Sequence, residues 1–156
     1  MPSTPTPETS TKHAGLEKLR ECFQNELSAT ETYMLALKSV PHVGLHHTLQ
    51  EILTSHDRRV EHLRESFAQI GAEPPTSSGA WGAFAKAIQA GADLLGNRAA
   101  IAALESGEDR SVELYTKGLE GCDARTRKII DTELLTAQQH THELARSLKQ
   151  YVNAPS

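Results

Sequence analysis

Four stretches of the chain carry apolar residues at every third or fourth position, the spacing that gathers side chains on one face of an α-helix. The first two predicted helices cover residues 15–40 and 45–70. Pro41 ends the first helix because proline cannot continue it, and Gly71 ends the second because glycine accepts the left-handed conformation found after a helix. Long amphipathic helices with such sharp ends restrict the chain to an all-α fold.

The second half of the chain contains two more helices of this kind. They are predicted to begin behind the capping residues Asn97 and Asp123. A shorter amphipathic segment within residues 76–96 lies between the two halves and is long enough to lead the chain from one end of a bundle to the other. The sequence therefore predicts two helical hairpins joined by a crossover helix, the arrangement of ferritin-like four-helix bundles.

Composition agrees with a single helical domain. The chain has 156 residues, of which 38% are apolar, so one domain can bury a core without disulfides. Aromatic residues make up only 4%, and alternating strand-forming runs are missing. We expect residues 15–152 to form the bundle and residues 1–14, which are rich in Pro, Ser and Thr, to be a disordered leader.

The charge pattern argues against two classes of partner. The net charge is −4 with both signs interspersed, and no basic block is present for nucleic acid. No apolar run approaches the roughly 18 residues of a membrane-spanning helix, and the N-terminus lacks the apolar stretch of a signal peptide. The two cysteines, Cys22 and Cys122, favour reduced thiols over a disulfide framework. We expect a cytoplasmic protein without nucleic-acid or membrane partners, and leave open the choice between a monomer and a homodimer.

Three of the predicted helices each carry one ionisable residue at a position where the helical spacing predicts an apolar residue. These residues are Glu26, His56 and Glu108, each close to the centre of its apolar sector and to the midpoint of its helix. Antiparallel packing would bring all three to a similar height in the bundle. A buried carboxylate without a partner costs several kcal/mol, so something positive must lie between the two glutamates. The candidates are a metal ion, a protonated His56, or Arg59 at the edge of the second stripe.

The fourth predicted helix has Ala137 at the same level, with Glu133 and His140 within one turn of it. A metal site would take Glu26, His56 and Glu108 together with Glu133 or His140 as its ligands. Carboxylates and imidazoles suit iron, manganese or zinc. A ferritin-like di-iron centre, however, also needs two Glu-x-x-His pairs, and no histidine of this chain follows a glutamate by three positions.

Three motifs resemble a known family. They are the segment Ala-Leu-Glu-Ser-Gly-Glu-Asp-Arg-Ser-Val-Glu-Leu-Tyr at residues 103–115, the turn Gly-Ala-Glu-Pro-Pro at residues 71–75, and His-Glu-Leu-Ala at residues 142–145. Together they resemble a bacterial family of ferritin-like four-helix-bundle proteins catalogued as a domain of unknown function. The resemblance implies the fold and brings no assigned reaction.

Two functional hypotheses follow from these residues. In the first, the protein is a stress-associated binding or structural bundle in which Glu26 and Glu108 form a satisfied polar network with His56 and Arg59. In the alternative, it is a metal-dependent oxidoreductase, with iron or manganese activating dioxygen or peroxide at an atypical centre. The discriminating observation is whether these side chains converge on one point as ligands or pair with Arg59.

Overall fold

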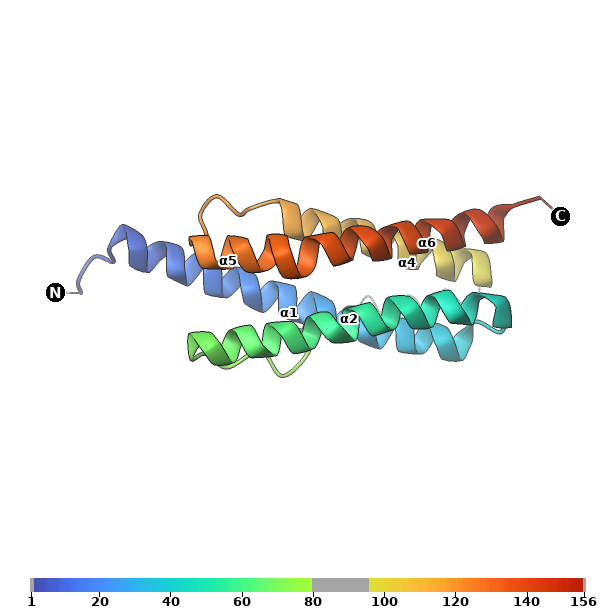
Figure 1. The fold of residues 1–156 in the computed structure, drawn as a ribbon, viewed down its shortest axis with the longest axis horizontal. Helices are drawn as coiled ribbons and strands as arrows, with labels where there is room; N and C mark the ends of the chain where they lie inside the picture. The colour runs from blue at the N-terminus through green and yellow to red at the C-terminus, as the bar shows by residue number, and fades with distance from the viewer. Residues whose placement is uncertain (1, 80–95, 156) are drawn as a thin grey trace.

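The protein forms an elongated helical bundle (Figure 1). The computed structural model describes residues 2–79 and 96–155, and within these ranges every regular element is a helix. The elements in chain order are α1 (Pro7–Ser39), α2 (Val43–Ile70), α4 (Asn97–Thr116), α5 (Ala124–Ile129), the π-helix η2 (Ile130–Leu135) and α6 (Thr136–Asn153). The last three follow one another without a break and form the fourth long helix of the bundle.

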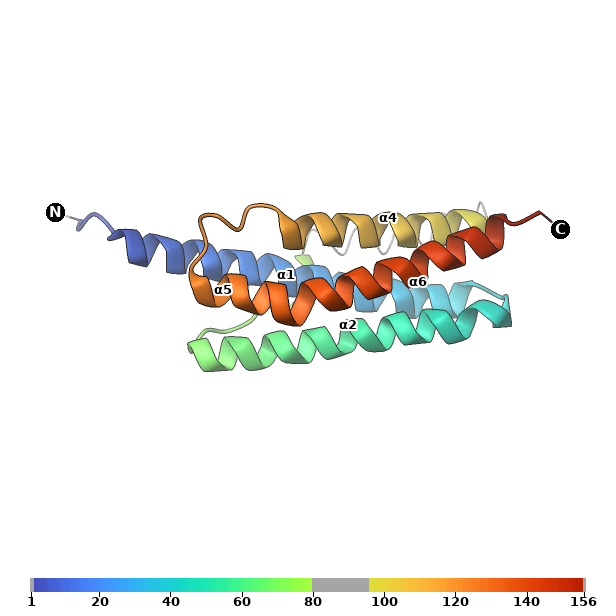
Figure 2. The ribbon, with the colours of Figure 1, turned by 45° about the horizontal axis from the view of Figure 1, so that its top comes forward.

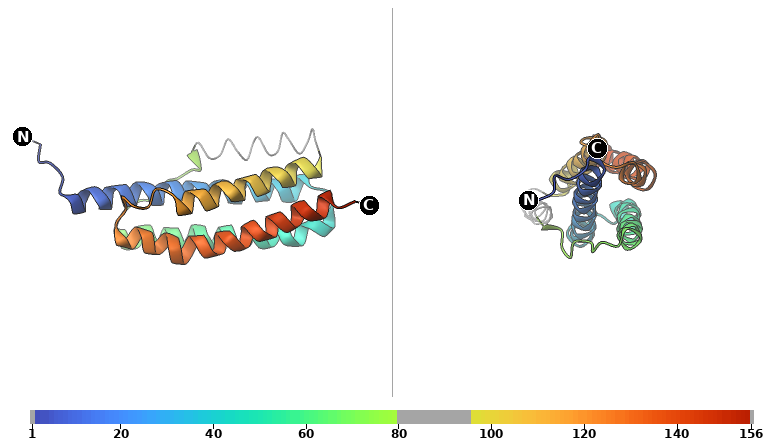
Figure 3. Two further views of the ribbon diagram at one scale, coloured as in Figure 1. Left: turned by 90° about the horizontal axis from the view of Figure 1, so that it is seen from above. Right: turned by 90° about the vertical axis from the view of Figure 1, so that its left-hand side faces the viewer.

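Two helical hairpins make up the bundle. α1 packs most extensively against α2, and α4 packs most extensively against α6, while α2 meets α6 and α1 meets α4 across the two hairpins. Figure 2 shows α6 beside both α4 and α2, and the end view in Figure 3 shows the four long helices surrounding a common axis. The predicted all-α, four-helix architecture is confirmed.

The first helix begins earlier than its apolar stripe predicts. It starts at Pro7, because Thr6 caps it by accepting a hydrogen bond from the Thr9 backbone N–H at 3.3 Å and because proline is favourable in the first turn. The disordered leader expected over residues 1–14 is therefore wrong for residues 7–14. In Figure 1 this polar first part of α1 projects beyond the ends of the neighbouring helices.

The other predicted helix ends agree closely with the structure. Gly71 adopts the left-handed conformation with φ 79° and its N–H donates to the Phe67 carbonyl at 3.0 Å, closing α2. Asp123 is the residue before α5, and α4 begins at Asn97. The crossover helix predicted within residues 76–96 falls mostly on residues 80–95, which lie outside the described residues. Among the helices that are described, none has an apolar stretch long enough to span a membrane.

The apolar core is divided into two clusters along the bundle axis. One cluster lies at the end of the bundle where α1 turns into α2, and it includes Leu45, Leu49 and Ile101. The other lies toward the opposite end and includes Phe23 and Phe67, whose rings meet edge to face with centroids 5.8 Å apart. On every long helix a short polar stretch separates the residues of the two clusters, and this stretch holds the candidate site.

Candidate functional site

A layer of buried polar side chains crosses the bundle between the two apolar clusters. Each of the four long helices contributes to it, and each member is at most 2% exposed. The layer consists of Glu26 from α1, His56 and Arg59 from α2, Glu108 from α4, and Gln138 and Thr141 from α6. The structure thus brings together the three predicted residues at the centre of the stripes.

The imidazole of His56 lies between the two carboxylates. Its Nδ1 is 2.6 Å from Glu26 Oε2, and its Nε2 is 3.0 Å from Glu108 Oε1. A neutral imidazole has only one N–H to donate, and an ionised carboxylate can only accept. Both contacts are therefore satisfied together when His56 is an imidazolium and both glutamates are ionised.

Arg59 supplies the second positive charge. One guanidinium nitrogen, Nη1, donates to Glu26 Oε1 at 3.2 Å and also to the side-chain oxygen of Gln138, while Nη2 donates to Thr141 Oγ1 at 3.2 Å. The layer then holds two carboxylates and two cations. This balance removes the cost of an uncompensated buried charge.

Glu108 is also held by neutral donors from α6. Thr141 Oγ1 donates to Glu108 Oε2 at 2.8 Å, and the Gln138 amide donates to the same oxygen and to the Glu108 backbone carbonyl. These bonds join the two helices of the second hairpin, and the contacts of His56 with Glu108 and of Arg59 with α6 connect this hairpin to the first.

Two tyrosines complete the layer by donating to the carboxylates. Tyr33 donates to Glu108 Oε1 at 2.7 Å, and its ring stacks on His56 with centroids 5.5 Å apart. Tyr115 donates to Glu26 Oε1 and accepts a 3.0 Å hydrogen bond from Asn25. Burial, followed by the charge of the neighbouring glutamate, raises the pKa of each tyrosine well above its ordinary value, so both remain donors.

The environment fixes the charge state of the acids and the imidazole. Burial alone would raise the pKa of Glu108, but the His56 charge and the hydrogen bonds from His56 and Tyr33 outweigh it and lower the pKa to about 2. For Glu26, burial is likewise outweighed, here by the Arg59 and His56 charges, and the pKa falls below its ordinary value. Burial and Arg59 depress the pKa of His56, but the two carboxylates raise it above its ordinary value. These directions agree with the charged states that the contacts require.

The structure does not bring Glu133 or His140 to the layer. Their side chains are 41% and 61% exposed, and each pairs with a residue of α2: Glu133 with His62 at 2.8 Å, and His140 with Glu51 at 3.6 Å. The prediction that Glu133 or His140 joins the three buried residues at the centre of the bundle is therefore wrong.

The reason is the angular position of these two residues on the fourth helix. Leu134 and Thr141, which belong to the predicted apolar stripe, are fully buried, and each of the two exposed residues directly precedes one of them. One residue turns an α-helix by about 100°, so the two side chains point away from the interior and toward α2 at the surface. Gln138, four residues after Leu134, takes the interior position, and Ala137 is only half-buried.

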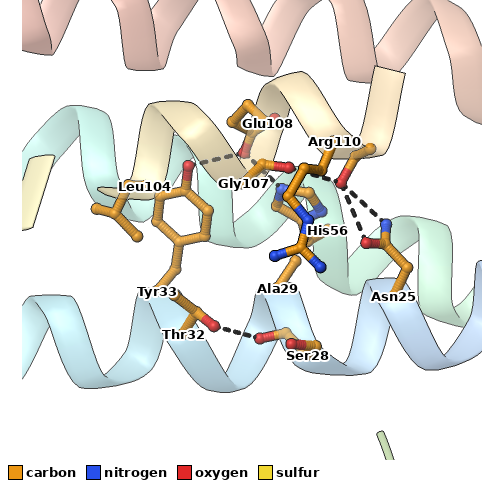
Figure 4. A pocket seen from close by; sticks show the side chains of 11 residues that line it. Asn25, Ser28, Ala29, Thr32, Tyr33, His56, Leu104, Gly107, Glu108 and Arg110 are labelled. Atoms are coloured by element: carbon orange, nitrogen blue, oxygen red, sulfur yellow. Dashed lines mark hydrogen bonds and ion pairs between the residues drawn. The ribbon is translucent and has the colours of Figure 1, made fainter. Parts of the chain in front are cut away.

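A pocket between α1 and α4 reaches the edge of the layer. Tyr33, His56 and Glu108 line its inner wall, and small residues such as Ala29 and Gly107 leave the space open between the two helices (Figure 4). The pocket places His56 and Glu108 at the wall of a small cavity between the two helices.

The comparisons with known proteins place the chain in a family. The family described as a domain of unknown function, DUF2383, matches residues 15–121. The chain belongs to this family. No curated protein and no solved structure matches it. The predicted resemblance to a domain of unknown function is thus confirmed. The matched region of this DUF2383 chain includes all four charged members of the layer, whereas Gln138 and Thr141 lie beyond it.

Arg59 supplies a buried positive charge that Glu26 needs. We expect Arg59→Met to reduce the free energy of unfolding by about 3–5 kcal/mol, because it leaves a buried carboxylate without its cation. Combining it with Glu26→Gln should recover part of that loss, since the orphaned charge is removed as well. Urea unfolding followed by circular dichroism measures both effects.

The neighbouring Arg58 provides a matched control, because it lies on the same helix and is exposed. Arg58→Met should change the free energy of unfolding by no more than about 0.5 kcal/mol. Equal effects of Arg58→Met and Arg59→Met would show that the buried ion pairs do not stabilise the DUF2383 bundle.

The ionised Glu108 carboxylate makes the stability of the fold depend on pH. The pKa of Glu108 is about 2 in the folded protein against an ordinary value of 4.5, so this group stabilises the fold above pH 4.5 and loses its contribution as the pH falls toward 2. Its share is on the order of 3 kcal/mol. Glu108→Gln should make the free energy of unfolding less dependent on pH in this interval. The exposed Glu143→Gln is the control that should keep the wild-type profile, and identical profiles for all three proteins would contradict this assignment.

Proposed function

We propose that the protein is a ferritin-like four-helix bundle that acts as a binding or structural protein of the stress-associated kind, with its mid-bundle layer neutralised by its own side chains. The observation that carries this proposal is the position of the two cations. His56 lies between the carboxylates of Glu26 and Glu108, and Arg59 bonds to Glu26.

The helix order supports the ferritin-like part of the proposal. Two hairpins of long antiparallel helices, with one glutamate facing inward from the first helix of each hairpin, correspond to the part of a di-iron bundle in which two helices supply a single glutamate each. At the corresponding level α2 and α6 supply His56, Arg59, Gln138 and Thr141 where such a centre has its Glu-x-x-His pairs. The scaffold suits a metal centre, but the donor set differs.

The contacts of the layer oppose metal binding for two reasons. An imidazole ligates through a deprotonated nitrogen, yet both nitrogens of His56 face carboxylates as donors. The guanidinium of Arg59 cannot lose its proton and repels a second cation beside Glu26. A metal would have to displace both cations from hydrogen bonds that are already satisfied.

The alternative is a metal-dependent oxidoreductase with iron, manganese or zinc at Glu26, His56 and Glu108. The pocket between α1 and α4 favours it, because this pocket reaches His56 and Glu108 and would admit a small reactant. That function requires His56 to turn or to lose both of its contacts before the two carboxylates can share an ion.

Metal loading separates the two functions. The purified protein is incubated anaerobically with iron, manganese or zinc, freed of excess metal and subjected to elemental analysis, beside Glu26→Gln and the double variant Glu26→Gln, Glu108→Gln. We expect the wild type and both variants to retain equal amounts of metal, because the layer does not hold an ion.

The opposite result is near-stoichiometric metal in the wild type that both variants lose. It would establish the layer as a metal centre and make assays with dioxygen and peroxide worthwhile. Gel filtration and circular dichroism identify a variant that has not folded. If the double variant does not fold, the comparison is made with Glu26→Gln alone.

A further inference from the structure

A second group of ligand-type side chains lies outside the mid-bundle layer, where α4 meets α6. Glu105 and Asp109 are one turn apart on α4, and His142 faces them from α6. One ligand atom from each of the three lies within 4.8 Å of the others. We propose that Glu105, Asp109 and His142 form a binding site for a divalent transition-metal ion of the zinc class.

The state of His142 is the observation that points to a ligand. Its Nε2 is shielded from solvent and makes no hydrogen bond with any described residue, although Asp109 Oδ1 lies 2.5 Å away and Glu105 Oε1 lies 3.8 Å away. The ring nitrogen is thus close enough for an ion pair but misaligned for a hydrogen bond. Buried ring nitrogens normally have an aligned partner, and a cation beside Nε2 would supply one.

The charges of the site also leave room for a cation. Lys149 donates to Glu105 Oε2 at 2.9 Å, which leaves Glu105 Oε1 directed to the same place as His142 Nε2. With a neutral His142, two carboxylates and one lysine leave a net negative charge. Either a metal ion beside Nε2 or a proton on His142 would compensate this negative charge. A zinc titration distinguishes the two cases.

The donor set selects the class of metal. One imidazole nitrogen with two carboxylate oxygens suits zinc, and also cobalt or nickel, whereas magnesium and calcium prefer oxygen ligands alone. Asp109 is 56% exposed, so an ion held here keeps water in its remaining coordination positions. Because the ligands come from α4 and α6, the ion would join the two helices of the second hairpin.

This site is separate from the mid-bundle layer even though Glu108 and Asp109 are adjacent in sequence. Glu108 is buried and faces Tyr33, His56 and α6, while the Asp109 carboxylate faces His142 near the surface. The proposal therefore does not depend on the function proposed for the layer, and substitutions can test the two independently.

The experiment is a zinc titration of the folded 156-residue chain at pH 7.5 by calorimetry, with cobalt absorption spectra as a second readout. We expect one zinc ion per chain, and at least tenfold weaker binding in His142→Ala and in Asp109→Asn. His140→Ala is the matched control, because His140 lies two residues away on the same helix and pairs with Glu51 instead. It should bind zinc as the wild type does.

The proposal is overturned if the wild type binds no zinc, which would assign the charge balance to a proton on His142. It is also overturned if His142→Ala binds as tightly as His140→Ala. Glu26→Gln should retain the full affinity, so zinc lost in His142→Ala alone supports this site, and zinc lost in Glu26→Gln alone contradicts the function proposed for the layer.

Discussion

The bundle depends on the contact between one imidazole and two carboxylates at its centre. Glu26 and Glu108 come from different hairpins, and His56 holds both of them. Without a cation between them, two buried carboxylates would repel each other or share a proton. The polar residues that surround the pair follow from this requirement: Arg59 balances the second charge, and the tyrosines, Gln138 and Thr141 satisfy the remaining oxygens.

The layer also bears on how the four helices find their register. Leucine and isoleucine stripes tolerate sliding by a turn, because one apolar contact replaces another with little loss. A buried ion pair does not tolerate it, since a slip leaves charges without partners. His56 and Arg59 of α2 both contact Glu26 on α1. Across the two hairpins, His56 also contacts α4 and Arg59 contacts α6. We infer that these directional contacts fix the positions of the four helices relative to one another along the bundle axis, which the two apolar clusters alone do not determine.

The sequence predicts the fold and the inner part of the site because both follow from helical periodicity. Glu26, His56 and Glu108 stand out as ionisable residues inside apolar stripes, and the structure brings them together. The fourth helix could not be placed in the same way. Its buried face is centred on Leu134, Gln138 and Thr141, farther from Glu133 and His140 than the apolar stripe alone predicts. Gln138 is uncharged, so it does not stand out in the sequence as a member of the site. The early start of α1 has a different reason: the Thr6 cap and Pro7 begin the helix without an apolar stripe.

The charge balance of the layer requires His56 to be an imidazolium compensated by two ionised glutamates. The most direct measurement is the nitrogen-15 NMR spectrum of the histidine side chains at pH 7.5, with His56→Gln used to assign the signals. We expect both ring nitrogens of His56 to carry a proton at this pH, and we expect added zinc or manganese to leave these signals in place. A neutral His56 ring, or loss of its protons on metal addition, would contradict the charge-balanced layer.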